Sequence, residues 1–255
     1  MKVGTSRTVL IVLAVVFVGG MLLLALAGDE SARRELPAQV LAWGTVGAIL
    51  FAGYWFRVRP RRELHRDEAR SLALHSEHGD PLGFFGRGFA LLAHVGGGKD
   101  IENTSWGTWR GMDVIVIDYW FTPSGADTPG ETRSYTCAAT SVPAEWPNLS
   151  IVPAGRGAAI AGAVRPDLSF ESERFNRSFE VRSPDPRFAH ALLDAQMIAW
   201  VEDLPPDTGF ELLGGTLLCR TPRGPVGDLT WALDTMAAFL ERIPPVVRSL
   251  YGPTV

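Results

Sequence analysis

The run Gly96-Gly97-Gly98-Lys99 has the residue types of a phosphate-binding loop, in which backbone N–H groups and a lysine hold the phosphates of a nucleotide. That motif needs a first glycine where this chain has Ala93. It also needs a serine or threonine after the lysine to hold magnesium, and here that residue is Asp100. Because both requirements fail, we interpret the run as a glycine-rich connection and predict no nucleotide site.

The histidines are candidates for metal binding or proton transfer. His75 and His78 stand near Glu77 and Asp80, a spacing that offers several ligands to one ion. Only two imidazoles are present there, whereas structural zinc takes four protein ligands and catalytic zinc takes three. His94 and His190 are single residues in apolar stretches, which favours packed and hydrogen-bonded side chains. The sequence therefore predicts no metal site.

The nucleophile candidates are Cys137 and Cys219, which both lie in predicted strands. These positions indicate small buried side chains in a reducing compartment rather than nucleophiles. The Gly-x-Ser-x-Gly motif of serine hydrolases is absent from the sequence. Acidic and basic residues alternate between residues 171 and 182, which predicts a solvated charge ladder of Glu171, Glu173, Arg174, Arg177, Glu180 and Arg182. We predict no catalytic residue, no cofactor-binding residue and no cofactor.

Composition limits the classes of partner. The chain has 255 residues, a length for one or two domains, and a formal net charge of −4 from 24 basic and 28 acidic residues. Nucleic-acid binding needs a positive footprint, so this balance argues against nucleic acid as a partner. Two cysteines cannot form a disulfide framework.

Two long uncharged stretches lie near the N-terminus, before all of the candidate residues discussed above. Residues 8–28 and 36–56 each span about 30 Å as a helix, the thickness of a bilayer's hydrocarbon core. The polar residues 29–35 separate them, and Pro37 suits the start of a second helix. We predict a transmembrane hairpin over residues 1–56. The alternatives are a pair of buried soluble helices and a cleaved signal peptide ending near Ala25-Leu26-Ala27.

Basic residues set the orientation, because Lys and Arg are retained on the cytoplasmic side. Lys2 and Arg7 precede the first span, and six arginines follow the second within residues 57–70. The tip carries only Arg33 and Arg34. We therefore predict a multi-pass protein of the cell membrane with both termini in the cytoplasm. The expected partners are the lipid bilayer and an unknown protein, with anionic headgroups contacted by Arg57, Arg59, Arg61 and Arg62.

The two spans contain no Asp, Glu, Lys, Arg or His, which disfavours a channel or transporter working alone. Gly44, Ala48 and Ala52 form a stripe of small residues, which favours packing of the two spans on each other over a homodimer interface. Residues 57–80 are predicted to form a basic juxtamembrane helix or linker that is exposed to solvent. The helical part is expected to begin after Pro60.

Residues 81–255 are predicted to form a cytoplasmic α+β domain with a mainly antiparallel sheet and two main helices; a small PH-like β-barrel with added helices is the alternative. In the first half we expect a β meander, because its connections are too short for crossover helices. In the second half we expect a strand near Phe179, a hairpin around Gly214-Gly215, one helix over 186–203 and another from Asp228. The meander's predicted strands cover residues 104–109, 112–121, 133–142 and 149–152.

Residues 171–200 and the hairpin over 214–218 contain a series in which a Phe-Asn-x-x-Phe-x-Val motif precedes an aspartate, an Ala-x-x-Leu-Leu motif and a methionine. This series resembles a family of uncharacterised membrane proteins of high-GC Gram-positive bacteria, which combine two N-terminal spans with a cytoplasmic α+β domain. The resemblance implies a shared fold and no activity. The matching residues are Phe175, Asn176, Phe179, Val181, Asp185, Ala189, Leu192, Leu193 and Met197.

Three functional hypotheses follow from the sequence. The favoured one is a membrane-tethered, non-enzymatic interaction or scaffold module. The second is a subunit of a larger membrane complex, which an exposed apolar patch would indicate. The third is a membrane-bound enzyme with an unrecognised site, which a deep cleft with convergent titratable side chains would indicate.

Overall fold

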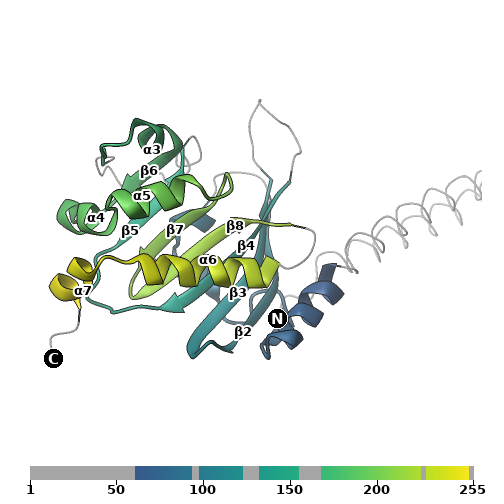
Figure 1. The fold of residues 1–255 in the computed structure, drawn as a ribbon. Helices are drawn as coiled ribbons and strands as arrows, with labels where there is room; N and C mark the ends of the chain where they lie inside the picture. The colour runs from purple at the N-terminus through teal and green to yellow at the C-terminus, as the bar shows by residue number, and fades with distance from the viewer. Residues whose placement is uncertain (1–60, 94–97, 123–131, 155–167, 225–227, 253–255) are drawn as a thin grey trace, which may run out of the picture. The chain divides into compact units, whose positions relative to one another are not determined.

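A computed structural model describes residues 61–93, 98–122, 132–154, 168–224 and 228–252 (Figure 1). The two predicted spans, the tip between them, Arg57 and Arg59 lie outside the described residues. Among the described helices, none combines the length and the apolar character that a bilayer crossing requires. Residues 62–255 belong to one compact unit.

An eight-stranded sheet organises the described residues, in the order β1-β2-β3-β4-β8-β7-β5-β6 (Figure 1). Every pairing in it is antiparallel, so the predicted α+β class with an antiparallel sheet is confirmed. The strands are β1 (His75–His78), β2 (Lys99–Trp109), β3 (Met112–Phe121), β4 (Arg133–Ser141), β5 (Leu149–Pro153), β6 (Phe179–Arg182), β7 (Gly209–Leu213) and β8 (Thr216–Pro222).

Two tight hairpins fix the register of the sheet. Gly214 and Gly215 join β7 to β8 with φ of 55° and 74°, the left-handed conformation that a two-residue hairpin turn requires. Arg110 and Gly111 join β2 to β3 in the same way, with φ of 49° and 78°. Both hairpins were predicted from the sequence, and both are confirmed.

The sheet has a core on each face, because successive side chains of a strand point to opposite sides. Val114 and Val116 of β3 pack in the larger core with the helices, whereas Ile117 and Tyr119 pack in a second core. The second core is closed by two short 3-10 helices, η1 (Phe84–Arg87) and η2 (Ala90–Leu92).

The helices are a leading helix over residues 61–71, α3 (Glu173–Ser178), α4 (Pro186–Leu192), α5 (Ala195–Glu202), α6 (Asp228–Arg242) and α7 (Pro245–Tyr251). The long helix α6 lies across the sheet over β3, β4 and β8 (Figure 1). Its start near Asp228 was predicted, because its apolar residues recur at helical spacing.

The segment predicted as one helix over 186–203 is two helices. Asp185 caps α4 as predicted, accepting hydrogen bonds from the N–H groups of Arg187 and Phe188. The chain then leaves the helical conformation at Leu193, and Asp194 caps α5 through the N–H of Met197 at 2.8 Å. The second aspartate is thus an N-cap that starts a new helix, which the apolar spacing alone did not reveal.

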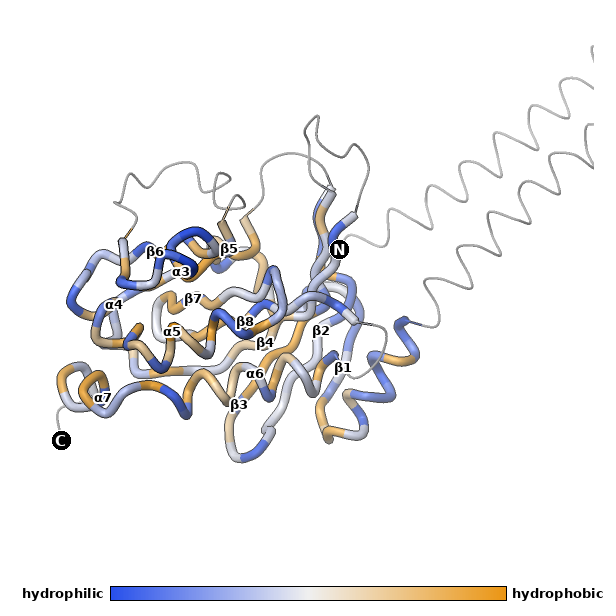
Figure 2. Tube along the Cα trace, turned by 45° about the horizontal axis from the view of Figure 1, so that its top comes forward, coloured by the Kyte–Doolittle hydropathy of each residue, from blue (hydrophilic) through white to orange (hydrophobic). Residues whose placement is uncertain are grey.

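Part of the predicted charge ladder is helical. Ser172 accepts a hydrogen bond from the N–H of Phe175 and begins α3, so Glu173, Arg174 and Arg177 stand on a helix. Figure 2 shows the hydrophilic character of the chain around α3 and β6. The solvated character was predicted, whereas the ladder geometry was wrong.

Residues 57–80 also differ from the exposed linker that we expected. Residues 61–71 are helical as predicted, but residues 75–78 form the edge strand β1, which pairs with β2 from His75–Trp106 to His78–Asn103. Ala69 is fully buried in the larger core and Leu74 is 6% exposed. The apolar contacts of these two residues hold the segment on the sheet, although its composition is mostly charged.

Of the four strands predicted to form a meander, the first three, β2, β3 and β4, are consecutive neighbours in the sheet, whereas the fourth, β5, is not next to β4. Beyond β4 the neighbouring strand is β8, and β5 pairs instead with β6 and β7. Among the described strands the order is linear and ends at β1 and β6, so these strands form an open sheet and not the PH-like barrel given as the alternative. Strand prediction from alternation does not specify which strands pair, and this pairing is decided by the tertiary contacts.

Candidate functional site

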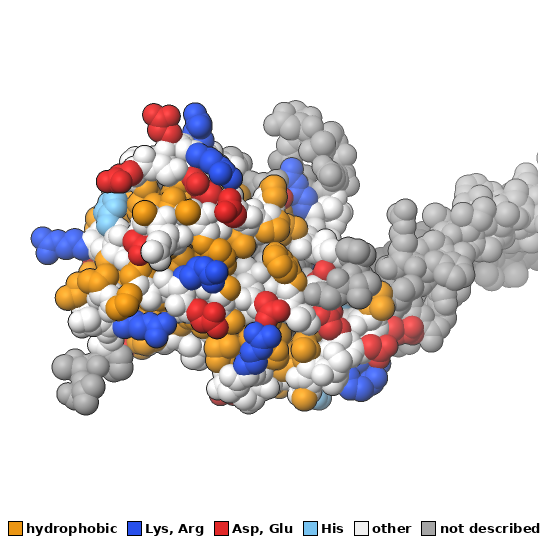
Figure 3. All heavy atoms as spheres, viewed as in Figure 1, with side chains coloured by type: hydrophobic (Ala, Val, Ile, Leu, Met, Phe, Trp, Pro, Cys, Tyr) orange, Lys and Arg blue, Asp and Glu red, His pale blue; other side chains and the backbone are white. Residues whose placement is uncertain are grey.

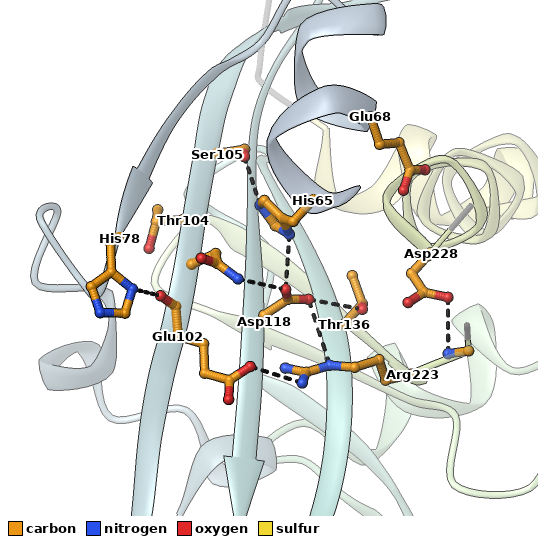
Figure 4. A network of polar contacts seen from close by, with 12 residues as sticks. His65, Glu68, His78, Glu102, Thr104, Ser105, Asp118, Thr136, Arg223 and Asp228 are labelled. Carbon is orange, nitrogen blue, oxygen red and sulfur yellow. Dashed lines mark hydrogen bonds and ion pairs between the residues drawn. The ribbon is translucent and has the colours of Figure 1, made fainter. Parts of the chain in front are cut away.

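A buried carboxylate, Asp118 of β3, is the centre of a network of polar contacts (Figure 4). Its cross-strand neighbours are Asn103 of β2 and Thr136 of β4. Asn103 donates to Oδ2 of Asp118 at 3.0 Å, and Thr136 donates to Oδ1 at 3.2 Å. A buried carboxylate needs such partners, because removing a charge from water without them costs several kcal/mol or more.

The leading helix contributes His65 to this network. His65 Nδ1 lies 2.9 Å from Oδ2 of Asp118, and His65 Nε2 lies 2.8 Å from Oγ of Ser105 (Figure 4). The order serine, histidine, aspartate is the arrangement that activates a nucleophilic serine in many hydrolases. Taken alone, this arrangement would favour the hypothesis of an enzyme.

Burial decides against catalysis at this position. Ser105 and Asp118 have no exposed surface and His65 is 1% exposed. A nucleophile must reach the carbonyl of its substrate, and in this structure the leading helix and the sheet enclose Ser105. The three side chains therefore act as a structural link between the leading helix and strands β2 and β3.

A second layer of the network involves Arg223 and Glu102. The guanidinium of Arg223 donates to Oε2 of Glu102 at 2.9 Å, and its Nε lies 3.7 Å from Oδ1 of Asp118. Glu102 occupies a bulge of β2, where the pairing register shifts between Ile101 and Asn103. The extra residue directs the Glu102 side chain towards Arg223 (Figure 4).

The leading helix is also joined to the start of α6. Oε1 of Glu68 accepts hydrogen bonds from the N–H of Thr230 at 2.9 Å and from its hydroxyl at 3.1 Å. A carboxylate at this position is favoured, because the first turn of a helix has unsatisfied N–H groups and a partial positive charge. The leading helix is therefore fixed to both the sheet and α6.

The candidate metal ligands of the sequence do not form a metal site among the described residues. His75 and His78 are exposed on β1; His75 contacts Oε1 of Glu77 at 3.1 Å and lies against the ring of Trp106. His78 contacts the carbonyl oxygen of Glu102 and Arg62. In the described parts of the chain, no three His, Cys, Asp or Glu side chains converge to hold an ion.

The other candidate residues of the sequence that the structure describes lie in the strands and helices of the domain, apart from any common site. Cys137 and Cys219 are fully buried thiols of neighbouring strands, as expected, and burial raises the pKa of Cys137 to about 12. The expectation of a packed side chain was wrong for His190 of α4, which is exposed; its ring lies tilted by 53° against that of Phe170, with ring centres 4.8 Å apart. Lys99 begins β2, while His94 and Gly96-Gly97 lie outside the described residues.

Sequence reasoning did not single out His65, Ser105 or the role of Asp118. One signal was present: Asp118 interrupts the apolar strand 112–121 on the same face as Val114 and Val116. A charged residue on a core-facing position requires a buried partner. The sequence does not identify that partner, because His65 is far away along the chain.

No family model matches the chain, and no curated protein matches it. One solved structure is similar, the crystal structure of the mycobacterial trehalose monomycolate transport factor A, TtfA, at 14% sequence identity and a TM-score of 0.47. The similarity covers 71% of this chain and 95% of that chain. A likeness of this degree carries no argument about function.

Proposed function

We propose that the chain is an integral membrane protein in which two N-terminal spans, residues 8–28 and 36–56, hold a non-enzymatic interaction domain at the cytoplasmic face of the cell membrane. The bilayer is one partner, contacted by the spans and by the headgroup-facing Arg57, Arg59, Arg61 and Arg62. A second protein is the other partner. The resemblance to two-span bacterial membrane proteins supports the same arrangement.

The observation that carries this proposal is the attachment of the leading helix. His65 and Ala69 are buried against the domain, and Glu68 binds the start of α6. Only residues 57–64 separate His65 from the end of the predicted second span, and a segment of this length reaches at most about 30 Å. A domain held this close to the bilayer meets membrane partners at a high effective concentration, which suits an interaction module.

Two features of the described surface favour this module over the other hypotheses. The Ser105–His65–Asp118 cluster is inaccessible, which weighs against an enzyme. The exposed large apolar side chains are dispersed over the leading helix, the turn before η1, α6 and α7, which weighs against a subunit with one extended apolar interface. These side chains are Leu64, Leu82, Trp231, Val246 and Leu250.

Reporter fusions test the topology. Alkaline phosphatase, active only outside the cytoplasm, and a green fluorescent protein that matures only inside it are each fused after Val255 and, as the matched control, within residues 29–35. We expect fluorescence from the C-terminal fusion and phosphatase activity from the tip fusion. Phosphatase activity from the C-terminal fusion, or complete release of the protein by alkaline carbonate, would refute the proposal.

A further inference from the structure

A hollow of about 760 Å³ opens between the segment before α3, the end of α4 and α5. Its floor is apolar: Leu193 and Ile198 line it and are 3% and 8% exposed, and Ala199 lies beside them. The ring of Phe170 forms one wall together with His190. The hollow is thus large enough to receive at least one apolar side chain of a partner.

The rim of the hollow is acidic. Glu171, Asp194 and Glu202 line it, and none of its lining residues is lysine or arginine. In Figure 3, acidic side chains lie around apolar ones in the region of α3 and α5, with basic side chains among them. The charge and the apolar floor together fit a ligand that carries both positive and apolar groups.

The three carboxylates are not equivalent. Glu202 accepts a hydrogen bond from Ser172 at 2.6 Å and lies 4.0 Å from Arg174, so it is partly compensated. Asp194 is the N-cap of α5. Glu171 is exposed on the rim, which makes it the carboxylate that an incoming cation meets first.

The arrangement does not fit a bound metal ion, because no three of the described His, Cys, Asp and Glu side chains converge on one point. The carboxylates are instead spread around an apolar floor. Spaced cationic side chains with an apolar residue between them satisfy that pattern better than a single ion does.

We propose that this hollow is the docking site for a basic segment of another membrane protein, which inserts an apolar side chain against Leu193 and Ile198 while its Lys or Arg residues meet the rim. This inference rests on the proposed function, which places the domain at the cytoplasmic face. The cytoplasmic loops that flank membrane spans are enriched in Lys and Arg, so segments of this chemistry are the ones available there.

Fluorescence anisotropy tests the site with detergent-solubilised full-length protein. The probe is a labelled model peptide in which Lys and Arg flank a central Leu-Phe pair. We expect the substitution Glu171→Arg to weaken binding about tenfold, because it reverses the charge on the rim. The matched control is Glu145→Arg, which makes the same change of net charge at an exposed carboxylate that does not line the hollow.

A second substitution tests the floor. Ala199→Trp fills the hollow from an exposed position of α5, and we expect it to abolish binding while leaving the unfolding temperature unchanged. Equal binding by the Glu171→Arg and Glu145→Arg variants, or no binding by the wild type, would overturn the inference. Tighter binding of a peptide of residues 57–66 than of the model peptide would overturn it too, since the occupant would then be a second copy of this chain.

The peptide measurement is independent of the topology measurement. Equal peptide binding by the Glu171→Arg and Glu145→Arg variants refutes the docking site, and the topology shown by the reporter fusions is not affected by that result. A periplasmic C-terminus refutes the cytoplasmic interaction module, and with it the assignment of the partner, even when the peptide binds.

Discussion

At the scale of single residues, Glu211 of β7 holds the segment that closes the second core. Its two carboxylate oxygens accept hydrogen bonds from the N–H groups of Ala90 and Leu91, both at 2.9 Å. Arg220 donates to the carbonyl oxygen of Leu91 at 2.9 Å, and the Tyr119 hydroxyl donates to that of Leu92 at 3.1 Å. Four hydrogen bonds therefore fix η2 over the aromatic core.

Burial raises the pKa of Glu211 to about 7, although the two backbone N–H groups and Arg220 act in the opposite direction. The folded protein therefore binds this proton more tightly than the unfolded chain. Its contribution to stability is complete below the unfolded pKa of 4.5 and is lost as the pH rises through about 7.

We expect the free energy of unfolding of the wild type, relative to Glu211→Gln, to fall by about 3 kcal/mol between pH 4.5 and pH 7.5. The amide of glutamine does not titrate, so the difference isolates this carboxyl group. Chemical denaturation of the detergent-solubilised protein at several pH values measures it. With Glu145→Gln as the exposed control, the corresponding difference should stay flat; a flat difference for Glu211→Gln would contradict the prediction.

At the scale of elements, the leading helix ends in a conformation that its sequence does not favour. The N–H of Leu74 bonds to the carbonyl of Ala69 at 2.8 Å, and Ala73 has a φ of 57°. This is the helix ending that usually places glycine in the left-handed position, because a Cβ atom is strained there. The turn directs Leu74 into the core and the chain into β1.

The substitution Ala73→Gly should raise the free energy of unfolding by about 0.5 to 1 kcal/mol, because relief of the left-handed strain exceeds the entropy that glycine adds to the unfolded chain. Thermal unfolding followed by tryptophan fluorescence measures the change. Ala238→Gly, in the right-handed interior of α6, should instead destabilise by about 1 kcal/mol. A destabilised Ala73→Gly variant would show that the Ala73 methyl group makes a necessary contact.

At the scale of the whole molecule, the domain begins earlier than composition indicates. The residues between 62 and 80 supply His65 to the buried network, Ala69 and Leu74 to the core, and the edge strand β1. A domain cut at residue 81 loses all of these. It also deprives Asp118 of the imidazole that lies beside it.

We expect a fragment of residues 62–255 to unfold in one cooperative transition. A fragment of residues 81–255 should be at least about 3 kcal/mol less stable, because a buried charge loses a partner and apolar contacts are lost. Urea unfolding of the two purified fragments measures the difference. Equal midpoints would mean that the leading helix and β1 are accessory to the fold.

The sequence by itself determined the local elements of the described domain. Alternation in residues 112–121, the Gly214-Gly215 turn, the Asp185 cap and the helical spacing after Asp228 each depend on neighbours a few residues away, and each is found in the structure. The absence of Asp, Glu, Lys, Arg and His from residues 8–28 and 36–56 is likewise a local property, and it still predicts the two spans.

Only the tertiary structure decided which distant residues meet. Whether β4 pairs with β5 or β8, and whether a charged segment such as residues 61–78 is a linker or part of the sheet, depends on apolar contacts between parts of the chain far apart in sequence. The same holds for His65, Ser105 and Asp118, and for the rim formed by Glu171, Asp194 and Glu202. Each residue alone is compatible with exposure to water, and the energy that fixes its position comes from partners that no short window of sequence contains.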